Sequence, residues 1–457
     1  MDPPVKTKMF SFKDDLIRNL IAFWVFGLCN NYAYVIMLSA AEDIMDKQED
    51  NNKNSNDSFC DVKITETHCS SVSTGAVLLA DILPTLVVKL TFPFFMHRIP
   101  FGIRHLTVVL LQAISYFIVA YSQSVAMSLT GVVFASLGAG LGEITYLALS
   151  AHFTSGTVSA WSSGTGGAGV IGSFAYAALT EPKLANLSPK DALLAMLVVP
   201  ALFALAYWFV MVPSPSIHKA NPIHPKTWLI PVRIASTSME KINKSSISVV
   251  SEDAWAAEMP IREVCKGREN YVEQRILTFD EKLALVVPLL KYMLPLATVY
   301  IGEYLINQGL TELIYFDCSH SFHLSRHSQY RWYQVLYQVG VFLSRSSVNL
   351  FRLPRWMLFV LPVLQITNAV FFAFDAVYFF IPHIWIVFII ILFEGLLGGS
   401  SYVNTFDRIH SEVAPDTREY SMSIASLADS LGVAISGFTA IPLHNFLCNQ
   451  QRFRISS

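Results

Sequence analysis

The apolar stretch of residues 125–150 reads VAMSLTGVVFASLGAGLGEITYLALS and contains a single charged side chain, Glu143. A helix needs about 20 mostly apolar residues to cross the hydrocarbon core of a bilayer, and this stretch is longer than that. It therefore predicts a transmembrane helix that carries Glu143 at membrane depth.

The composition of the whole chain agrees with this interpretation. Of its 457 residues, 53% are hydrophobic and only 14% are charged, whereas soluble domains carry about 25% charged residues. Charge this sparse cannot cover water-facing surfaces, which excludes a set of soluble domains. A formal net charge of −2 gives no argument for a nucleic-acid partner, and six cysteines are too few for a disulfide scaffold. The sequence predicts an all-α polytopic membrane protein.

About eleven stretches are apolar and long enough to be transmembrane helices. Six precede a polar central segment, at residues 16–38, 72–96, 106–121, 125–150, 158–179 and 192–212. Five follow it, at residues 288–315, 330–350, 356–374, 383–406 and 420–446. The predicted organisation is an N-terminal segment 1–15, a six-helix half 16–212, a flexible linker 213–282, a five-helix half 283–446 and a tail 447–457.

The distribution of basic residues orients the helices, since cytosolic loops carry an excess of lysine and arginine. The linker has ten basic residues, and the N-terminus carries Lys6, Lys8, Lys13 and Arg18, whereas loop 41–71 has eight acidic residues against three lysines. The N-terminus and linker are therefore expected in the cytosol and loop 41–71 in the lumen. Arg452 and Arg454 do not fit this orientation, because they put positive charge at a C-terminus that eleven spans place in the lumen.

The first loop has features of a non-cytosolic segment. Asn56, in Asn56-Asp57-Ser58, is a glycosylation acceptor. Cys60 and Cys69 lie on the oxidising side and are close enough in sequence to form a disulfide. Free thiols or another pairing are the alternative, because Cys318 is expected on the same side.

The two halves share local patterns in the same helix order. A Leu-Gly-x-x-x-Tyr pattern ends in Tyr146 in one half and in Tyr402 in the other, and amide pairs occupy the first helix of each half, Asn30-Asn31 and Asn307-Gln308. Glycine-rich segments in the fifth and eleventh spans also correspond, although small residues also serve helix packing. The repeat favours the two-half architecture of major-facilitator-type transporters.

A small set of ionisable side chains falls inside the predicted spans, where charge costs about 2.5–3.5 kcal/mol per residue. Lys291 and Asp375 lie near helix ends, and the depth of Lys89 is left open. Glu143 and Glu303 lie mid-span and are candidates for proton coupling. The full set is Asp81, Lys89, Glu143, Lys291, Glu303, Arg345, Asp375, Glu394 and Asp429.

Arg345 is the best-placed cation in this set. Its guanidinium can recognise phosphate or carboxylate through paired hydrogen bonds. The alternative is that it anchors the cytosolic end of its helix together with Arg352 and Arg355.

Several segments together resemble the battenin family of lysosomal membrane proteins. They read FGLCNN at 26–31, AVLLADILPTL at 76–86, WSSGTGGAG at 161–169, EYLINQG at 303–309, QYRWYQ at 329–334 and EGLLGG at 394–399. The resemblance implies a major-facilitator-like fold, a late endosomal and lysosomal location, and clearance of glycerophosphodiesters with effects on lysosomal pH and trafficking. Family tails usually end in a prenylation box, whereas nine residues follow Cys448 here, and the linker lacks the family's acidic dileucine pattern.

The leading hypothesis is a multi-pass transporter, not an enzyme, that exports a small anionic phosphodiester by alternating access and needs no cofactor or metal. Arg345 would bind the phosphate. Four amides would bind the polyol, and these are Asn30, Asn31, Asn307 and Gln308. Three tyrosines would complete the site, and these are Tyr146, Tyr333 and Tyr402. Glu143 or Glu303 would carry the proton, with Glu394 and Asp81 as further candidates. The alternative is a scaffold that recruits trafficking proteins through residues 213–282 and transports nothing.

Overall fold

The computed structural model describes residues 14–33, 35–36, 74–180, 185–220, 227–230, 275 and 277–456. Within these ranges the regular structure is helical, and it comprises eleven long helical segments, six before and five after the linker. The all-helical polytopic fold expected from the composition is thus confirmed. The glycosylation acceptor Asn56, the pair Cys60 and Cys69, and most of the linker lie outside the described residues.

The N-terminal half contains six helical segments. The first covers residues 14–33 and 35–36. It is followed by α2 (Thr74–Thr91), two short 3₁₀ turns (Phe92–Phe94 and Met96–Arg98), α3 (Phe101–Ala120), α4 (Val125–Ser150) and α5 (Gly156–Thr180). The sixth segment is built from α6 (Pro189–Ala195), α7 (Val198–Leu205) and η3 (Ala206–Val210).

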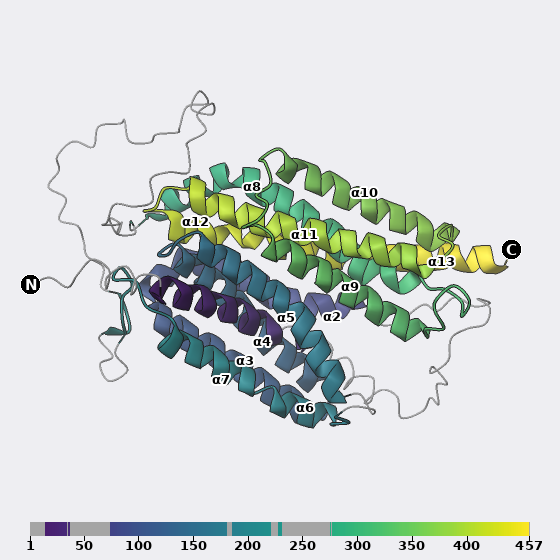
Figure 1. The fold of residues 1–457 in the computed structure, drawn as a ribbon, viewed down its shortest axis with the longest axis horizontal. Coiled ribbons are helices and arrows are strands. Elements are labelled where there is room, and N and C mark those ends of the chain that lie inside the picture. Colours follow the sequence, from purple (N-terminus) through teal and green to yellow (C-terminus); the bar gives the residue numbers. More distant parts are fainter. Residues whose placement is uncertain are drawn as a thin grey trace, which may run out of the picture.

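The C-terminal half contains five. The first is α8 (Phe279–Leu305), which continues through η6 (Ile306–Leu310) and η7 (Thr311–Leu313). Next come α9 (Arg326–Ser346), α10 (Met357–Tyr378) and α11 (Ile384–Glu412), and α12 (Arg418–Ala425) with α13 (Leu427–Ser456) forms the last. Figure 1 shows the two halves side by side, with the early helices in purple to teal and the late helices in green to yellow.

Several helix boundaries differ from the sequence prediction, among them the starts of α3 and α8 and the end of α13. Helix α3 begins at Phe101, not at residue 106, directly after Pro100. Helix α8 begins at Phe279, not at residue 288, because Thr278 and Glu281 form a capping box that satisfies the first backbone amides. The last helix continues to Ser456, so most of the segment predicted as a tail is helical.

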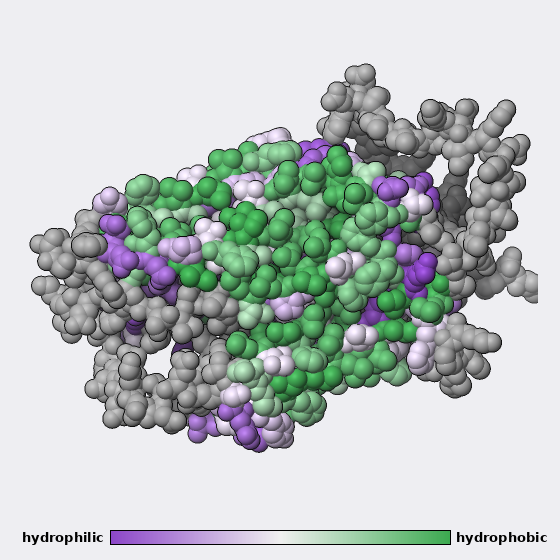
Figure 2. Space-filling model, turned by 180° about the vertical axis from the view of Figure 1, so that it is seen from behind, coloured by the Kyte–Doolittle hydropathy of each residue, from purple (hydrophilic) through white to green (hydrophobic). Residues whose placement is uncertain are grey.

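The outer faces of the bundle are apolar. Large hydrophobic side chains such as Phe174, Phe209 and Leu294 are strongly exposed. Figure 2 shows one face of the bundle, on which a broad hydrophobic region in green lies between hydrophilic ends. Among the described residues, seven helical segments are long and apolar enough to span a membrane by themselves. Helix α9 is not one of them, because glutamine, arginine, serine and tyrosine interrupt its apolar residues.

Helix α9 is instead held by very close packing against α11. A Cβ atom on Gly340 of α9 would collide with the backbone of Leu392, and one on Gly395 of α11 would collide with the backbone of Tyr337. Small residues of this kind let membrane helices approach until their backbones touch. Between the halves, α5 packs on α9 and α2 packs on α13.

The two ends of the bundle can be named by the helices that begin or end there. We call the N-terminal face the end at which the first helix, α8 and α12 begin, and the opposite face the end at which α13 finishes (Figure 1). Gln451, in the last turns of α13, donates hydrogen bonds to the carbonyl oxygens of Leu313 and Ala376. Leu313 ends η7 and Ala376 lies in the last turn of α10, which places Gln451 at the opposite face.

Two described cysteines, Cys318 and Cys448, are each disulfide-bonded. Cys318 follows η7 and Cys448 lies near Gln451, so both belong to the opposite face. Disulfides persist in oxidising compartments. A lumenal C-terminus, which an odd number of spans requires when the N-terminus is cytosolic, stays a prediction.

Cys448 is expected to carry a disulfide and no prenyl group. Because its thiol is bonded and buried, a maleimide reagent should label it only after reduction. Mass spectrometry of the C-terminal peptide, with and without reduction, measures both properties, and the buried free thiol of Cys29 serves as the internal control. A prenyl mass on Cys448 would contradict this expectation.

Candidate functional site

A central cavity lies between the two halves and encloses about 770 Å³ of space not filled by protein atoms, including its open mouth. Helices of both halves supply its walls. From the N-terminal half these are Asn31, Val35, Ile82, Thr85, Lys89, Ala139, Gly140, Glu143, Thr165 and Gly169. From the C-terminal half they are Tyr300, Tyr304, Tyr337, Gln338, Val341, Arg345, Tyr402, Asp429, Ser430 and Val433. Four of these residues are charged, which is unusual at membrane depth and points to a functional role.

Arg345 projects from α9 and is surrounded by neutral groups. Its Nη1 donates to Thr165 Oγ1 at 2.7 Å and its Nη2 donates to the Tyr300 hydroxyl at 2.9 Å. The guanidinium also lies 4.3 Å from the centre of the Tyr402 ring. Among the described residues no carboxylate forms a salt bridge with it, and its Nε has no hydrogen-bond partner. Arg345 therefore offers a positive charge to an anion that enters the cavity.

Lys89 projects from α2 and is fully buried between two carboxylates. Its Nζ lies 2.6 Å from Glu143 Oε2 on α4 and 2.9 Å from Asp429 Oδ1 on α13. It also donates to the carbonyl oxygen of Ser426 at 2.9 Å. We call Lys89, Glu143 and Asp429 the charge cluster; it joins the N-terminal half to the C-terminal half.

Tyr402 connects the charge cluster to Arg345. Its hydroxyl donates to Glu143 Oε1 at 2.8 Å and accepts from the Trp161 indole at 3.2 Å, while its ring lies under the guanidinium. Of the residues proposed from sequence, the structure thus brings together Arg345, Glu143, Tyr402 and Asn31 in one cavity.

Other predicted residues of the N-terminal half lie within that half, outside the cavity lining. The Asn30 side chain donates to the Ala139 carbonyl at 3.0 Å and lies so close to Gly142 that a Cβ atom there would collide with it. The Tyr146 hydroxyl is hydrogen-bonded to His105 at 2.5 Å within an aromatic cluster. Asp81 is buried in α2, beside Ser136 of α4, which donates to its backbone carbonyl.

The predicted carboxyls of the C-terminal half lie behind the cavity wall. The hydroxyl of Tyr337, a cavity residue, donates to Glu303. Behind Glu303, Asn307 donates to Glu394 Oε1 at 2.9 Å. Both carboxyls are buried, and among the described residues neither forms a salt bridge.

Two remaining predicted residues also lie away from the cavity lining. The Tyr333 hydroxyl donates to the Ile314 carbonyl at 3.3 Å in the core of the C-terminal half. Gln308 lies in η6, next to the buried Asn307.

Sequence reasoning gave no role to Lys89 or Asp429, although both were among its ionisable candidates. Their opposite charges at membrane depth were the available signal, because a buried charge needs a partner. Tyr300, Thr165 and Gln338 could not be singled out, since tyrosines, hydroxyls and amides are common in these helices.

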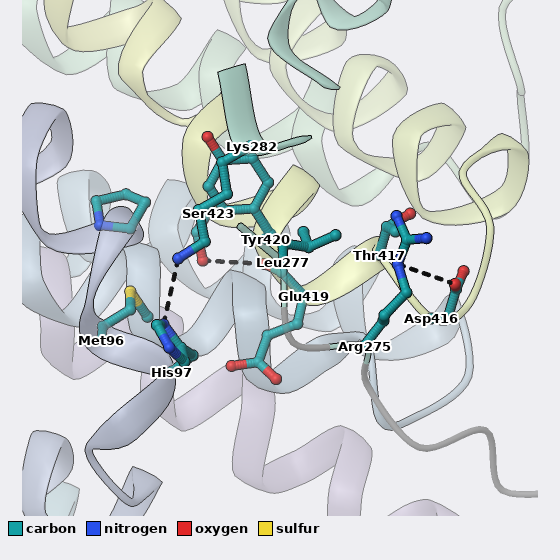
Figure 3. Close-up of a pocket in the computed structure, with 11 residues that line it drawn as sticks. Met96, His97, Arg275, Leu277, Lys282, Asp416, Thr417, Glu419, Tyr420 and Ser423 are labelled. Atoms are coloured by element: carbon teal, nitrogen blue, oxygen red, sulfur yellow. Dashed lines mark hydrogen bonds and ion pairs between the residues drawn. The ribbon is translucent and has the colours of Figure 1, made fainter. Parts of the chain in front are cut away.

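A second, smaller cavity lies at the N-terminal face (Figure 3). Lys282 of α8 points there toward the turn after α2, donating to the Phe94 carbonyl and lying 3.3 Å from His97 Nδ1. Burial, followed by the nearby Lys282 and Arg98, lowers the pKa of His97, so its neutral ring can accept from Lys282. Arg275, at the end of the linker, lies 3.9 Å from Asp416 of the C-terminal half and forms a salt bridge with it.

Further polar contacts hold the halves together at this face. Glu419 of α12 lies 3.6 Å from Arg104 and 3.3 Å from His152 of the N-terminal half. His410 donates to the Ser150 carbonyl at 3.1 Å. The described polar contacts between the halves extend from the charge cluster to this face, which is therefore the closed one.

Comparison with known proteins identifies the family. The sequence profile of the CLN3 protein family matches residues 21–450. Battenin of the dog, Canis lupus familiaris, is 42% identical over 446 residues, covering 96% of this chain and 93% of that protein. Protein btn-1 of Neurospora crassa is 35% identical over 94% of this chain and 88% of that protein.

A solved structure supports the fold at low sequence identity. The human organic anion transporter MFSD10 (TETRAN) superposes with a TM-score of 0.52 and 13% identity, covering 96% of this chain and 95% of that chain. This likeness shows a major-facilitator-like fold. The family profile over residues 21–450 and the 42% identity to canine battenin show that the chain belongs to the battenin, or CLN3 protein, family.

Proposed function

We propose that this chain is a lysosomal and late endosomal membrane transporter that exports glycerophosphodiesters, such as glycerophosphoglycerol, by alternating access. The observation that carries the proposal is Arg345, which lines a polar cavity between the two halves and has no carboxylate partner among the described residues. The N-terminal face is assigned to the cytosol, in agreement with the positive-inside rule.

A phosphodiester carries one negative charge and exposed oxygens, and these match the site around Arg345. The planar guanidinium can donate two parallel hydrogen bonds to one phosphate. It is at present bonded to Thr165 and Tyr300, whose hydroxyls can turn to the ligand oxygens. Removal of these groups from water strengthens the charge–charge attraction.

The hydroxyls of a glycerol moiety need donors and acceptors on the remaining walls. Asn31, Gln338 and Ser430 line the cavity and supply both, beside the Tyr402 ring. We assign Asn30, Asn307 and Gln308 to the support of these walls, together with Tyr146 and Tyr333.

The state seen here fits one step of the transport cycle. Contacts of Glu419 and Lys282 close the N-terminal face, so the cavity would receive substrate from the lumen. Export then requires these contacts to break and the halves to rock about the cavity.

Of the four carboxyls that the sequence offers for proton coupling, Glu143 lines the cavity itself. Glu303 is one hydrogen bond behind the wall, through Tyr337, and Glu394 lies next to Asn307 at greater depth. Asp81 is assigned a supporting role in α2. The battenin-family likeness also suggests effects on lysosomal pH and trafficking, with residues 213–282 as the contact for trafficking proteins.

The purified chain in liposomes is expected to exchange internal unlabelled glycerophosphoglycerol for the external radiolabelled compound. The rate should exceed that of empty liposomes, and excess unlabelled glycerophosphoglycerol should suppress it, whereas glycerol, which lacks the phosphate, should not. Absence of exchange under every pH gradient would remove the proposal. It would favour the scaffold alternative, which predicts that deleting the linker abolishes function in cells.

A further inference from the structure

The four charged side chains that line the central cavity balance one another. Lys89 and Arg345 are cations, and Glu143 and Asp429 are acids, so the ionised set has no net charge. An uncompensated charge costs several kcal/mol away from water. A cavity of this kind therefore resists any step that leaves it charged.

The charges are unevenly placed within the cavity. Both carboxylates contact Lys89, whereas Arg345 contacts neutral hydroxyls and an aromatic ring. The charge cluster thus has one negative charge in excess, and Arg345 supplies the compensating positive charge. An anion that binds to Arg345 takes this compensation away, and one carboxylate of the cluster then becomes a favourable place for a proton.

The geometry distinguishes the two carboxylates. Glu143 lies on α4 and Lys89 on α2, so their ion pair stays within the N-terminal half, and Tyr402 also donates to Glu143. Asp429 lies on α13, and its ion pair with Lys89 crosses between the halves. A proton on Asp429 weakens the crossing pair and leaves Lys89 neutralised by Glu143.

Other ionisable groups also face Asp429, and they do not replace Lys89 as its partner. Tyr300 and Glu303 approach from α8, and Tyr402 approaches from α11. Glu303 is already hydrogen-bonded to Tyr337. Arg345, from α9, is held by Thr165 and Tyr300.

We infer that each singly charged anion crosses together with one proton carried by Asp429, so that transport is electroneutral. The proton separates Asp429 from Lys89 and thereby releases the halves for rocking. This inference rests on the proposed function and specifies its coupling. An acidic lumen would then drive export, since both the proton and the anion leave in the same step.

The test uses the full-length chain in liposomes with radiolabelled glycerophosphoglycerol. Two transport modes are compared: exchange at equal pH, and net uptake driven by an imposed pH gradient or by a potassium–valinomycin potential. The wild type is expected to accumulate substrate when a proton gradient is imposed, and an internal dye should report a fall in pH. The uptake rate should not depend on the membrane potential. A wild-type uptake that responds to the potential would overturn electroneutral coupling without any variant.

Asp429→Asn removes the proton site and the excess negative charge together. It is expected to lose accumulation on the proton gradient and to gain uptake driven by an inside-positive potential, because the anion now crosses without a proton. The gained response cannot come from a misfolded protein. Asp375→Asn is the matched control, since Asp375 is a buried carboxyl on α10 outside the cavity lining, and should behave as wild type.

The outcomes separate the two proposals. Accumulation by Asp429→Asn on the proton gradient would overturn the coupling role and leave the transport function intact. A wild type that does not exchange substrate would remove the transport function and the coupling with it. Glu143→Gln provides a second check, because Asp429 then stays paired to Lys89 and exchange itself is expected to be lost.

Discussion

Replacing Arg345 by alanine is expected to lower glycerophosphoglycerol exchange about 100-fold, because an anion buried without its cation loses about 3 kcal/mol of binding free energy. Initial exchange rates in liposomes, measured over a range of substrate concentrations, give the loss. Arg345→Lys should restore part of it, since lysine keeps the charge and loses the two parallel hydrogen bonds.

The control for this prediction is Arg352→Ala. Arg352 lies near the same end of α9 and pairs with Asp407 at 2.9 Å, but its side chain is largely exposed and does not line the cavity. Its removal is expected to leave exchange nearly unchanged, because Arg352 does not line the cavity. Thermal unfolding measured in parallel accounts for Asp407, which is buried and loses its cation. Equal loss in both variants would mean that Arg345 only anchors its helix at the membrane surface.

Replacing Lys89 by methionine is expected to destabilise the folded protein by about 3–5 kcal/mol and to abolish transport, because it leaves two buried carboxylates without their cation. Thermal unfolding in detergent or nanodiscs measures the first effect and liposome exchange the second. Neutralising all three members of the charge cluster, with Glu143→Gln and Asp429→Asn added, should restore most of the stability and none of the proton coupling.

Lys291→Met is the matched control for this second prediction. Lys291 is also a lysine within a membrane helix, but it is exposed on α8, lies over the Tyr292 ring and forms no salt bridge within the part of the chain that the structure describes. Its replacement should change the melting temperature little. A melting temperature for Lys89→Met equal to that of Lys291→Met would show that the charge cluster does not hold the halves together.

Much of the fold could be predicted because membrane helices need long apolar runs, and these are visible in the sequence. The span at 125–150 was predicted at the bounds of α4. The start of α8 was missed because the first turn of this helix is charged. Only the capping box of Thr278 and Glu281 indicates where the helix begins. The end of α13 was missed because its last turns are polar.

The candidate site could be predicted only in part, because sequence position gives depth in the membrane but not the facing partner. Glu143 and Arg345 were found through the rarity of charge at that depth. Lys89 could not be assigned, since its partner Asp429 lies in the other half of the chain. Tyr146 and Tyr402 occupy equivalent sequence patterns, yet only Tyr402 lies among the residues that line the cavity.

The polar character of α9 has a consequence for how the protein is made. A helix with so few apolar residues is a weak substrate for insertion on its own, so α9 depends on neighbours for its stability in the bilayer. Its closest neighbour is α11, through Gly340 and Gly395, and α11 leaves the ribosome later. Stable insertion of α9 therefore requires that α11 has been synthesised. Substitutions at these glycines are expected to impair membrane insertion and to increase degradation, whatever their effect on substrate binding.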